Sequence, residues 1–250
     1  MNVEELQLSN ALTIPLLGEL VPGGFEYGQL LLVVYEPDSL WYDASLTIAA
    51  RAVKDGIRVE YHAYENLPSR VREAFSSLGL NVPKLEDEDR LRILDSYTVQ
   101  TGLGSLEKPS KSKIATQPLK LSDSSIEFSQ QIKAGIPDTD KRWLHIDDNW
   151  GVMLQYNDEK TILNFSRTRM PLWVSARETT FIVALMTGIA SEAFYKQYMA
   201  VNDGIIDFRS EERSGQVEHL VRVRVMRRRK YDSRWHRLQI LENGEVALAD

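Results

Sequence analysis

The stretch IPLLGELVPGGFEYGQ, residues 14–29, is followed at once by LLLVV, residues 30–34, and by YEPDSLWY, residues 35–42. The first of these segments is rich in turn-forming residues. The run LLLVV is apolar without alternation, which is typical of a strand buried on both faces of a sheet. A helical pattern then extends from Asp43 to Lys54 and ends at Gly56. This order predicts the first strand-to-helix crossing of an α/β sheet.

The rest of the chain alternates short apolar runs with helical patterns. Further strands are predicted over Ile57–His62, Leu91–Leu94, Trp143–Ile146 and Phe181–Met186. Helices are predicted over Pro68–Leu78, Ser124–Ala134, Asp158–Thr168 and Ser191–Met199. The end of the chain instead predicts strands joined by turns, over Ile205–Phe208, Val217–Met226 and His236–Leu241. We therefore expect one α/β domain over residues 1–250, with a mostly parallel central sheet flanked by helices and a C-terminal antiparallel β-hairpin.

The composition excludes several classes of protein. The chain has no cysteine, so it has no disulfide framework, thiolate zinc site or cysteine nucleophile. No apolar run approaches the roughly 18 residues needed to cross a bilayer, and the acidic N-terminus is unlike a signal peptide. These features predict a cytoplasmic protein with no membrane partner. The net charge of −6 argues against general coating of nucleic acid. The Ser-, Lys- and Gly-rich stretch Gln100–Pro118 predicts a mobile loop.

A phosphate-binding loop of the form G-x-x-x-x-G-K-[ST] would occupy the crossing between the first strand and helix. The entry segment resembles the I-P-G-L-D-E-L-L-G-G-G-I-P-R-G-S segment of the KaiC branch of RecA-like ATPases, and the two sequences run in step as far as Gly56. At that register the family's glycine positions hold Tyr35, Asp38 and Leu40. Trp41 stands at the lysine, Tyr42 stands at the magnesium-binding hydroxyl, and Pro37 matches. The resemblance therefore implies the family's fold with a degenerate phosphate loop.

Physical chemistry gives the same conclusion about this loop. Glu36 and Asp38 place carboxylates where phosphate would lie, and like charges at close range repel by on the order of a few kcal/mol near a protein surface. Side chains at the former glycine positions block close approach of the backbone. We expect Trp41 and Tyr42 to fill the old site, with Trp41 packed inward over Asp147.

Other segments resemble landmarks of the same family. HAYENLP, residues 62–68, keeps Glu65 of a glutamate pair and has Asn66 in place of the second. RLRILDSYT, residues 90–98, and QPLKLSDSSIEF, residues 117–128, resemble the third strand and the loop and helix before the fourth. WLHIDD, residues 143–148, resembles the Walker B strand, with Asp147 in the metal-facing position. Because lysine and hydroxyl are missing opposite Asp147, we expect no stable Mg–ATP site. Asp147 then remains as a capping or loop-anchoring carboxylate.

The remaining polar residues give no second active site. His62, His145, His219 and His236 lack metal-ligand spacing, so no metal is expected, and His145 is interpreted as a core residue. The acidic run LEDEDR, residues 85–90, predicts a solvated loop. Exposed helix faces are predicted for Glu159, Arg167, Arg169 and Arg177.

The strongest charge feature is the segment HLVRVRVMRRRKYDSRWHRLQIL, residues 219–241. It resembles the family's K-M-R-G-S-x-H-D…H-P-F-x-I hairpin, which in assembled rings reaches the neighbouring subunit's nucleotide. Val225 replaces the lysine, whereas Met226, Arg227, Asp232 and His236 match. Three interpretations remain open for Arg227, Arg229 and Lys230: a solvated tip paired with acidic groups, an arginine donated to a partner's ATP, or nucleic-acid contact helped by stacking on Trp235 or Tyr231. Because the chain as a whole is acidic, nucleic-acid contact is the least favoured of the three interpretations.

The sequence thus predicts a RecA-like fold without family catalysis. The leading hypothesis is a non-catalytic paralogue, a regulatory or scaffold subunit with no ATP or Mg²⁺ cofactor. It would assemble with itself or with an active RecA-like ATPase. Alternatives are a weakly active ATPase with a remodelled loop and a nucleic-acid-binding recombination paralogue. The resemblance implies archaeal signalling, timing, motility or recombination as the setting.

Overall fold

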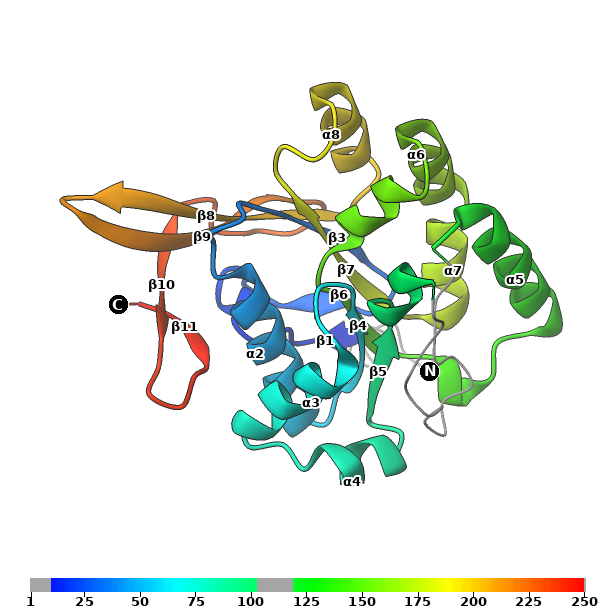
Figure 1. Cartoon of the computed structure of the whole chain (residues 1–250), viewed down its shortest axis with the longest axis horizontal. Helices are drawn as coiled ribbons and strands as arrows, with labels where there is room; N and C mark the ends of the chain where they lie inside the picture. The colour runs from blue at the N-terminus through cyan, green and yellow to red at the C-terminus, as the bar shows by residue number, and fades with distance from the viewer. Residues whose placement is uncertain (1–9, 103–118, 250) are drawn as a thin grey trace.

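The structure, a computed structural model, describes residues 10–102 and 119–249 (Figure 1). Beyond Gly102, the predicted loop Gln100–Pro118 lies outside the described residues. In the part that is described, no helix is both long enough and apolar enough to traverse a bilayer.

Within these ranges, a nine-stranded sheet forms the centre, in the order β11-β10-β9-β8-β3-β7-β6-β4-β5. Its strands are β3 (Leu30–Tyr35), β4 (Arg58–Ala63), β5 (Leu91–Asp95), β6 (Trp143–Asp147), β7 (Thr180–Met186), β8 (Gly204–Arg213), β9 (Gln216–Met226), β10 (His236–Ile240) and β11 (Val246–Leu248). Strands β8, β3, β7, β6, β4 and β5 run parallel, whereas β9, β10 and β11 pair antiparallel. The predicted α/β class with an antiparallel C-terminal edge is confirmed.

The unbroken apolar run predicted as the first strand is the middle of the sheet. Every residue of β3 is buried, because helices cover both of its faces. The helices are α2 (Trp41–Lys54), α3 (Pro68–Ser77), α4 (Val82–Asp87), α5 (Leu121–Ala134), α6 (Glu159–Thr168), α7 (Met170–Arg177) and α8 (Glu192–Met199). Short 3-10 turns span Leu17–Glu19, Thr98–Thr101, Asp138–Asp140 and Trp150–Gln155. A small sheet pairs β1 (Ala11–Leu12) with β2 (Phe25–Glu26).

Two apolar cores lie on opposite faces of the sheet. One packs α2, α3 and α4 against Leu31, Val33, Ile146 and Ile182. The other packs α6, α7 and α8 against Leu30, Leu32, Phe181 and Val183. The alternation along β3 and β7 explains this division, since successive side chains of a strand point to opposite faces. We call these the α2 face and the α6 face.

The C-terminal strands continue the sheet beyond β3. Strands β8 and β9 project from the body as a long ribbon (Figure 1), turned by Ser214 and Gly215, both at positive φ. A two-residue turn of this type matches the right-handed twist of paired strands. The last strand returns to the body, where the Val246 N–H donates to Thr47 Oγ1 (2.9 Å) and Glu245 pairs with Arg51 and Lys54.

Two local predictions were wrong. The run LEDEDR, residues 85–90, is not a free loop, because helix α4 continues through Asp87 and buries Leu85. Arg177 does not lie on an exposed face: it ends α7 buried, where its guanidinium meets Glu60. In contrast, Arg167 and Arg169 are exposed as predicted, and Glu159 is half-buried.

Candidate functional site

The carboxyl ends of β3, β4 and β6 converge where the crossing from β3 to α2 takes place, which is where open α/β sheets bind ligands. The connecting residues 36–40 form a tight turn. The Ser39 N–H and hydroxyl both donate to the Glu36 carbonyl, at 3.0 and 2.7 Å. The Glu36 carboxylate accepts from the Ser210 N–H at 3.1 Å, whereas Asp38 is exposed. This turn contains two carboxylates and no cationic side chain.

Trp41 fills the interior beside this turn. Its side chain is 1% exposed, and its indole N–H donates to the Asp148 carbonyl at 2.8 Å. The ring packs edge-on against Phe208, with centroids 5.3 Å apart, and tilts against Tyr35 at 6.3 Å. The predicted inward packing is therefore present, but the polar contact of Trp41 is with Asp148.

The other aromatic residues of the loop are also held by the chain itself. The Tyr35 hydroxyl donates to Glu65 Oε1 at 3.3 Å, and the Asn149 amide donates to the same oxygen at 2.7 Å. Burial, reinforced by the Asp148 and Asp43 carboxylates, raises the pKa of Tyr42 to about 12, so its hydroxyl stays protonated. Leu40 is buried at the start of α2. Glu65 thus serves as an acceptor within this aromatic cluster.

Asp147 is placed differently from the prediction. Along β6, Leu144 and Ile146 enter the core of the α2 face. His145 and Asp147 alternate with them and point to the α6 face, where the His145 ring stacks on Phe181 at 4.1 Å between centroids. Trp41 and Asp147 therefore lie on opposite faces of the sheet.

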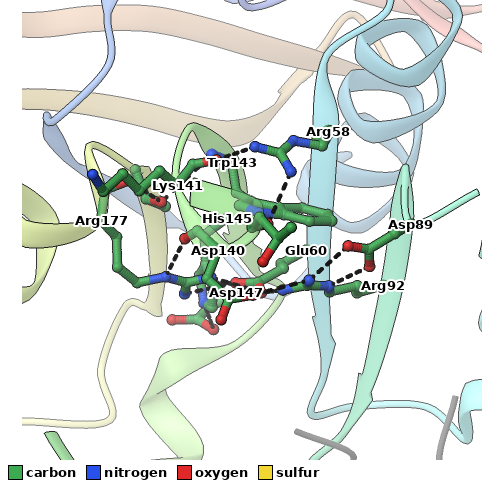
Figure 2. A network of polar contacts seen from close by, with 12 residues as sticks. Arg58, Glu60, Asp89, Arg92, Asp140, Lys141, Trp143, His145, Asp147 and Arg177 are labelled. Carbon is green, nitrogen blue, oxygen red and sulfur yellow. Dashed lines mark hydrogen bonds and ion pairs between the residues drawn. The ribbon is translucent and has the colours of Figure 1, made fainter. Parts of the chain in front are cut away.

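A network of buried polar groups surrounds His145 (Figure 2). Glu60 receives both guanidinium nitrogens of Arg177, at 2.9 and 3.0 Å, and Arg92 Nη1 at 3.0 Å. Its Oε2 lies 3.1 Å from His145 Nδ1. Burial alone would raise the pKa of Glu60, but Arg177 and His145 lower it well below its ordinary value. Glu60 is thus a buried carboxylate that binds three nitrogen-bearing side chains.

At its outer edge the network reaches two half-exposed carboxylates. Arg92 also pairs with Asp89 (2.7 Å) and Asp140 (3.1 Å). The Trp143 ring lies between two guanidinium groups, with Arg92 Cζ 4.0 Å and Arg58 Cζ 4.8 Å from its centroid (Figure 2). Stacking on Trp143 therefore helps to fix the position of Arg92, one of the two arginines that hold Glu60.

Beyond Glu60, the register of the sheet brings two histidines and Asp147 together. His145 Nε2 and His62 Nδ1 lie 3.1 and 3.2 Å from the same Asp147 oxygen, Oδ1. One ligand atom from each of the three lies within 4.8 Å of the others, and all three residues are buried. Two imidazoles and a carboxylate at this spacing could hold a metal ion.

Sequence reasoning missed this cluster because it searched for ligand spacing along one segment. The signal was Glu60-x-His62 in one buried strand and His145-x-Asp147 in another. A spacing of two residues places each pair on one face of its strand, and the pairing of β4 with β6 brings the two faces together.

The arginine segment after β9 lies far from this cluster along the chain and is partly bound by its own chain. Arg229 donates to the Gly23 and Gly24 carbonyls, at 3.1 and 3.2 Å, and pairs with Glu26. Arg227 is exposed and donates to the Ala200 carbonyl at 2.7 Å. Lys230 is exposed as well. Arg227 and Lys230 are therefore the more accessible cations of the three.

Trp235 is also engaged within the chain. The guanidinium carbons of Arg209 and Arg222 lie 4.0 and 4.4 Å from its ring centroid. A base that stacked on this ring would have to compete with these cations.

Comparison with known proteins places the chain in a family. A family model described as the KaiC ATPase matches residues 11–249. The fold is similar to that of a KaiC-like protein from the hyperthermophilic archaeon Pyrococcus horikoshii OT3, with a TM-score of 0.71, 15% identity, and coverage of 96% of this chain and 99% of that one. No curated protein sequence matches. The family match spans nearly all of the sequence, from the entry segment to the last strand, and the chain therefore belongs to the KaiC ATPase family.

Proposed function

We propose that this chain is a non-catalytic member of the KaiC family, a regulatory or scaffold subunit that does not bind Mg–ATP. The observation that carries the proposal is Trp41, which stands at the position of the phosphate-binding lysine and is buried with its indole N–H on the Asp148 carbonyl. A lysine there would extend toward phosphate. The indole instead closes the space and adds no charge.

Electrostatics support the same conclusion. Residues 35–42 include Glu36 and Asp38 and no lysine or arginine. Two like unit charges 4 Å apart repel by about 4 kcal/mol at an effective dielectric constant of about 20. A triphosphate at this turn would therefore meet repulsion where an intact loop supplies a lysine and glycine N–H groups.

Isothermal titration with ATP and ADP, each with Mg²⁺, tests this proposal. We expect no saturable heat up to millimolar nucleotide and no phosphate release. An intact-loop KaiC-family ATPase measured in parallel is the positive control. Binding of ATP or ADP at micromolar concentration would support the rival hypothesis of an ATPase with a remodelled loop and would contradict the non-catalytic one.

The proposal includes assembly, either with further copies of this chain or with an active KaiC-family ATPase. Its support is Arg227, which is exposed beside β9 at the position where the family's hairpin carries an arginine. In a complex with an active ATPase, an added guanidinium could stabilise charge on the partner's nucleotide. We expect this chain to raise the partner's rate of ATP hydrolysis.

Arg227→Ala tests the arginine, and Arg234→Ala is the matched control. Arg234 is also exposed and lies in the same connection between β9 and β10, but it pairs with Asp232. We expect Arg227→Ala to lose the stimulation and Arg234→Ala to keep it. Equal stimulation by both variants would remove Arg227 from the proposal, and light scattering of each mixture reports assembly separately.

The nucleic-acid alternative has less support, because Trp235 and Arg229, two of the groups it would use, are engaged within the chain. Trp235 lies against Arg209 and Arg222, and Arg229 is bound to the entry segment. It predicts salt-sensitive DNA binding that weakens in Arg227→Ala/Arg229→Ala. We expect no such binding at low salt.

A further inference from the structure

Four polar residues of β4 and β6 form a patch in the mainly apolar core of the α6 face. Strands β4 and β6 run parallel and pair Glu60 with His145 and His62 with Asp147. Next to them, β7 places Phe181 beside His145 and Val183 beside Asp147. The four polar residues therefore form two adjacent cross-strand pairs beneath the helices of the α6 face.

Two of the distances within this patch are close to those between the ligands of a small tetrahedral cation. A zinc ion with bonds of about 2.0–2.1 Å to nitrogen and oxygen separates its ligand atoms by about 3.3–3.4 Å. Asp147 Oδ1 lies 3.1 Å from His145 Nε2 and 3.2 Å from His62 Nδ1. The three ligand atoms lie within 4.8 Å of one another, so an ion bound to all three would draw the two imidazoles together around it.

His62 provides independent support. Its side chain is 3% exposed, and neither of its ring nitrogens has a hydrogen-bond partner among residues 10–102 and 119–249. Although Nδ1 is close to Asp147, the angles do not form a hydrogen bond. Buried polar groups in proteins are nearly always paired, and an unpaired one calls for an explanation such as an ion.

The groups that would orient the ligating histidine are already in place. His145 turns Nδ1 toward Glu60, which leaves Nε2 directed at Asp147. Arg92 and Arg177 fix Glu60 in turn. A carboxylate that holds the other nitrogen of a ligating histidine is the usual support of a metal site, because it sets the tautomer and the orientation of the ring.

Charge balance gives the same answer. Asp147 is 1% exposed, and its contacts among the described residues are the two imidazoles. The arginines of the network instead bind Glu60, Asp89 and Asp140. A buried carboxylate is costly unless positive charge lies beside it, and a metal ion held by the two imidazoles would supply that charge.

We propose that His62, His145 and Asp147 bind one divalent first-row transition metal ion, with zinc as the best fit. The ligand atoms are His62 Nδ1, His145 Nε2 and Asp147 Oδ1, and the fourth position takes water. Imidazole ligands favour zinc and its neighbours over Mg²⁺, which prefers oxygen. This site replaces our expectation, drawn from spacing along the chain, that no metal binds. It is on the α6 face, so it does not depend on the phosphate loop.

Metal analysis of the full chain tests this proposal. Protein purified from zinc-supplemented medium should contain one zinc per chain by plasma mass spectrometry. After removal of zinc by a chelator, titration with Co²⁺ should produce the intense visible bands of tetrahedral coordination and saturate at one equivalent. Less than stoichiometric metal in both experiments would overturn the proposal.

The four histidines of the chain supply a matched pair of variants. His62→Leu removes a proposed ligand without breaking a hydrogen bond seen among the described residues. We expect metal affinity to fall more than about 100-fold, a larger loss than is typical when a residue that only orients a ligand is changed. His219→Asn/His236→Asn removes the other two histidines and should leave binding unchanged. Binding that survives His62→Leu, or that is lost in the double variant, would contradict the assigned ligands.

A measurement on the unmodified chain guards against a variant that fails to fold. In NMR spectra of protein labelled with ¹⁵N-histidine, zinc should shift the ring signals of two of the four histidines. Shifts of all four, or of none, would overturn the proposal without any substitution.

Discussion

On the α2 face, Trp41, Tyr35 and Phe208 pack together, and the indole N–H of Trp41 reaches a main-chain carbonyl. On the α6 face, at the ends of β4 and β6, His62 and Asp147 are buried side by side. In the first region, the Trp41 indole and the Tyr35 hydroxyl both have partners within the chain. In the second, both ring nitrogens of His62 lack a hydrogen-bond partner in the part of the chain that the structure describes. The two regions thus differ in whether their buried polar side chains find partners in the described part of the chain.

Glu60→Ala should lower the free energy of unfolding most, because Glu60 is at the centre of the buried polar network on the α6 face. The substitution leaves Arg92 and Arg177 buried without their shared carboxylate, and breaking a buried ion pair in this way costs about 3–5 kcal/mol. Urea unfolding measures the change. Glu73→Ala is the control, since Glu73 forms an exposed pair with Arg70 and should cost less than about 1 kcal/mol. Equal effects of the two variants would mean that Glu60 does not organise this face.

Trp41→Phe, in the aromatic cluster of the α2 face, should lower the free energy of unfolding by an intermediate amount. The variant keeps an aromatic ring but leaves the Asp148 carbonyl without its indole donor, and an unsatisfied buried acceptor costs about 1–3 kcal/mol. The same urea measurement applies, with nucleotide titration alongside. We expect stability to fall and nucleotide binding to remain absent. Restored binding in this variant would show that the indole alone had blocked a competent site.

His62→Leu should have the smallest effect, and only when metal is removed. In chelator, the variant should lose less than about 0.5 kcal/mol, because replacing an unpaired buried polar group by an apolar one is nearly neutral or stabilising. In zinc, the unmodified chain should gain stability through binding while His62→Leu gains none. A loss above about 1 kcal/mol in chelator would show that the imidazole has a partner without metal.

The fold could be predicted because its signals are local. The all-apolar strand at Leu30–Val34 and the helix up to Lys54 depend on patterns within a few residues, and the structure confirms both. The site could be predicted only in part. The absence of a cation in the loop is visible in sequence, but the partner of Trp41 and the burial of Arg177 depend on segments more than 100 residues away.

The face on which Asp147 lies shows why the rest could not be predicted. Resemblance placed it opposite the loop, whereas alternation along β6 turns it to the α6 face beside His145. That alternation could be read from the sequence. The pairing of β4 with β6, which brings His62 to the same point, could not, because strand order in a parallel sheet is set by long-range packing.

The most direct test of the account follows the indole N–H of Trp41 by NMR during titration with Mg–ATP. Its signal is the one of five indole signals that disappears in Trp41→Phe. We predict that this signal stays in place up to millimolar nucleotide, because the buried ring remains bonded to the Asp148 carbonyl. A saturable shift or loss of the signal at micromolar ATP would contradict it.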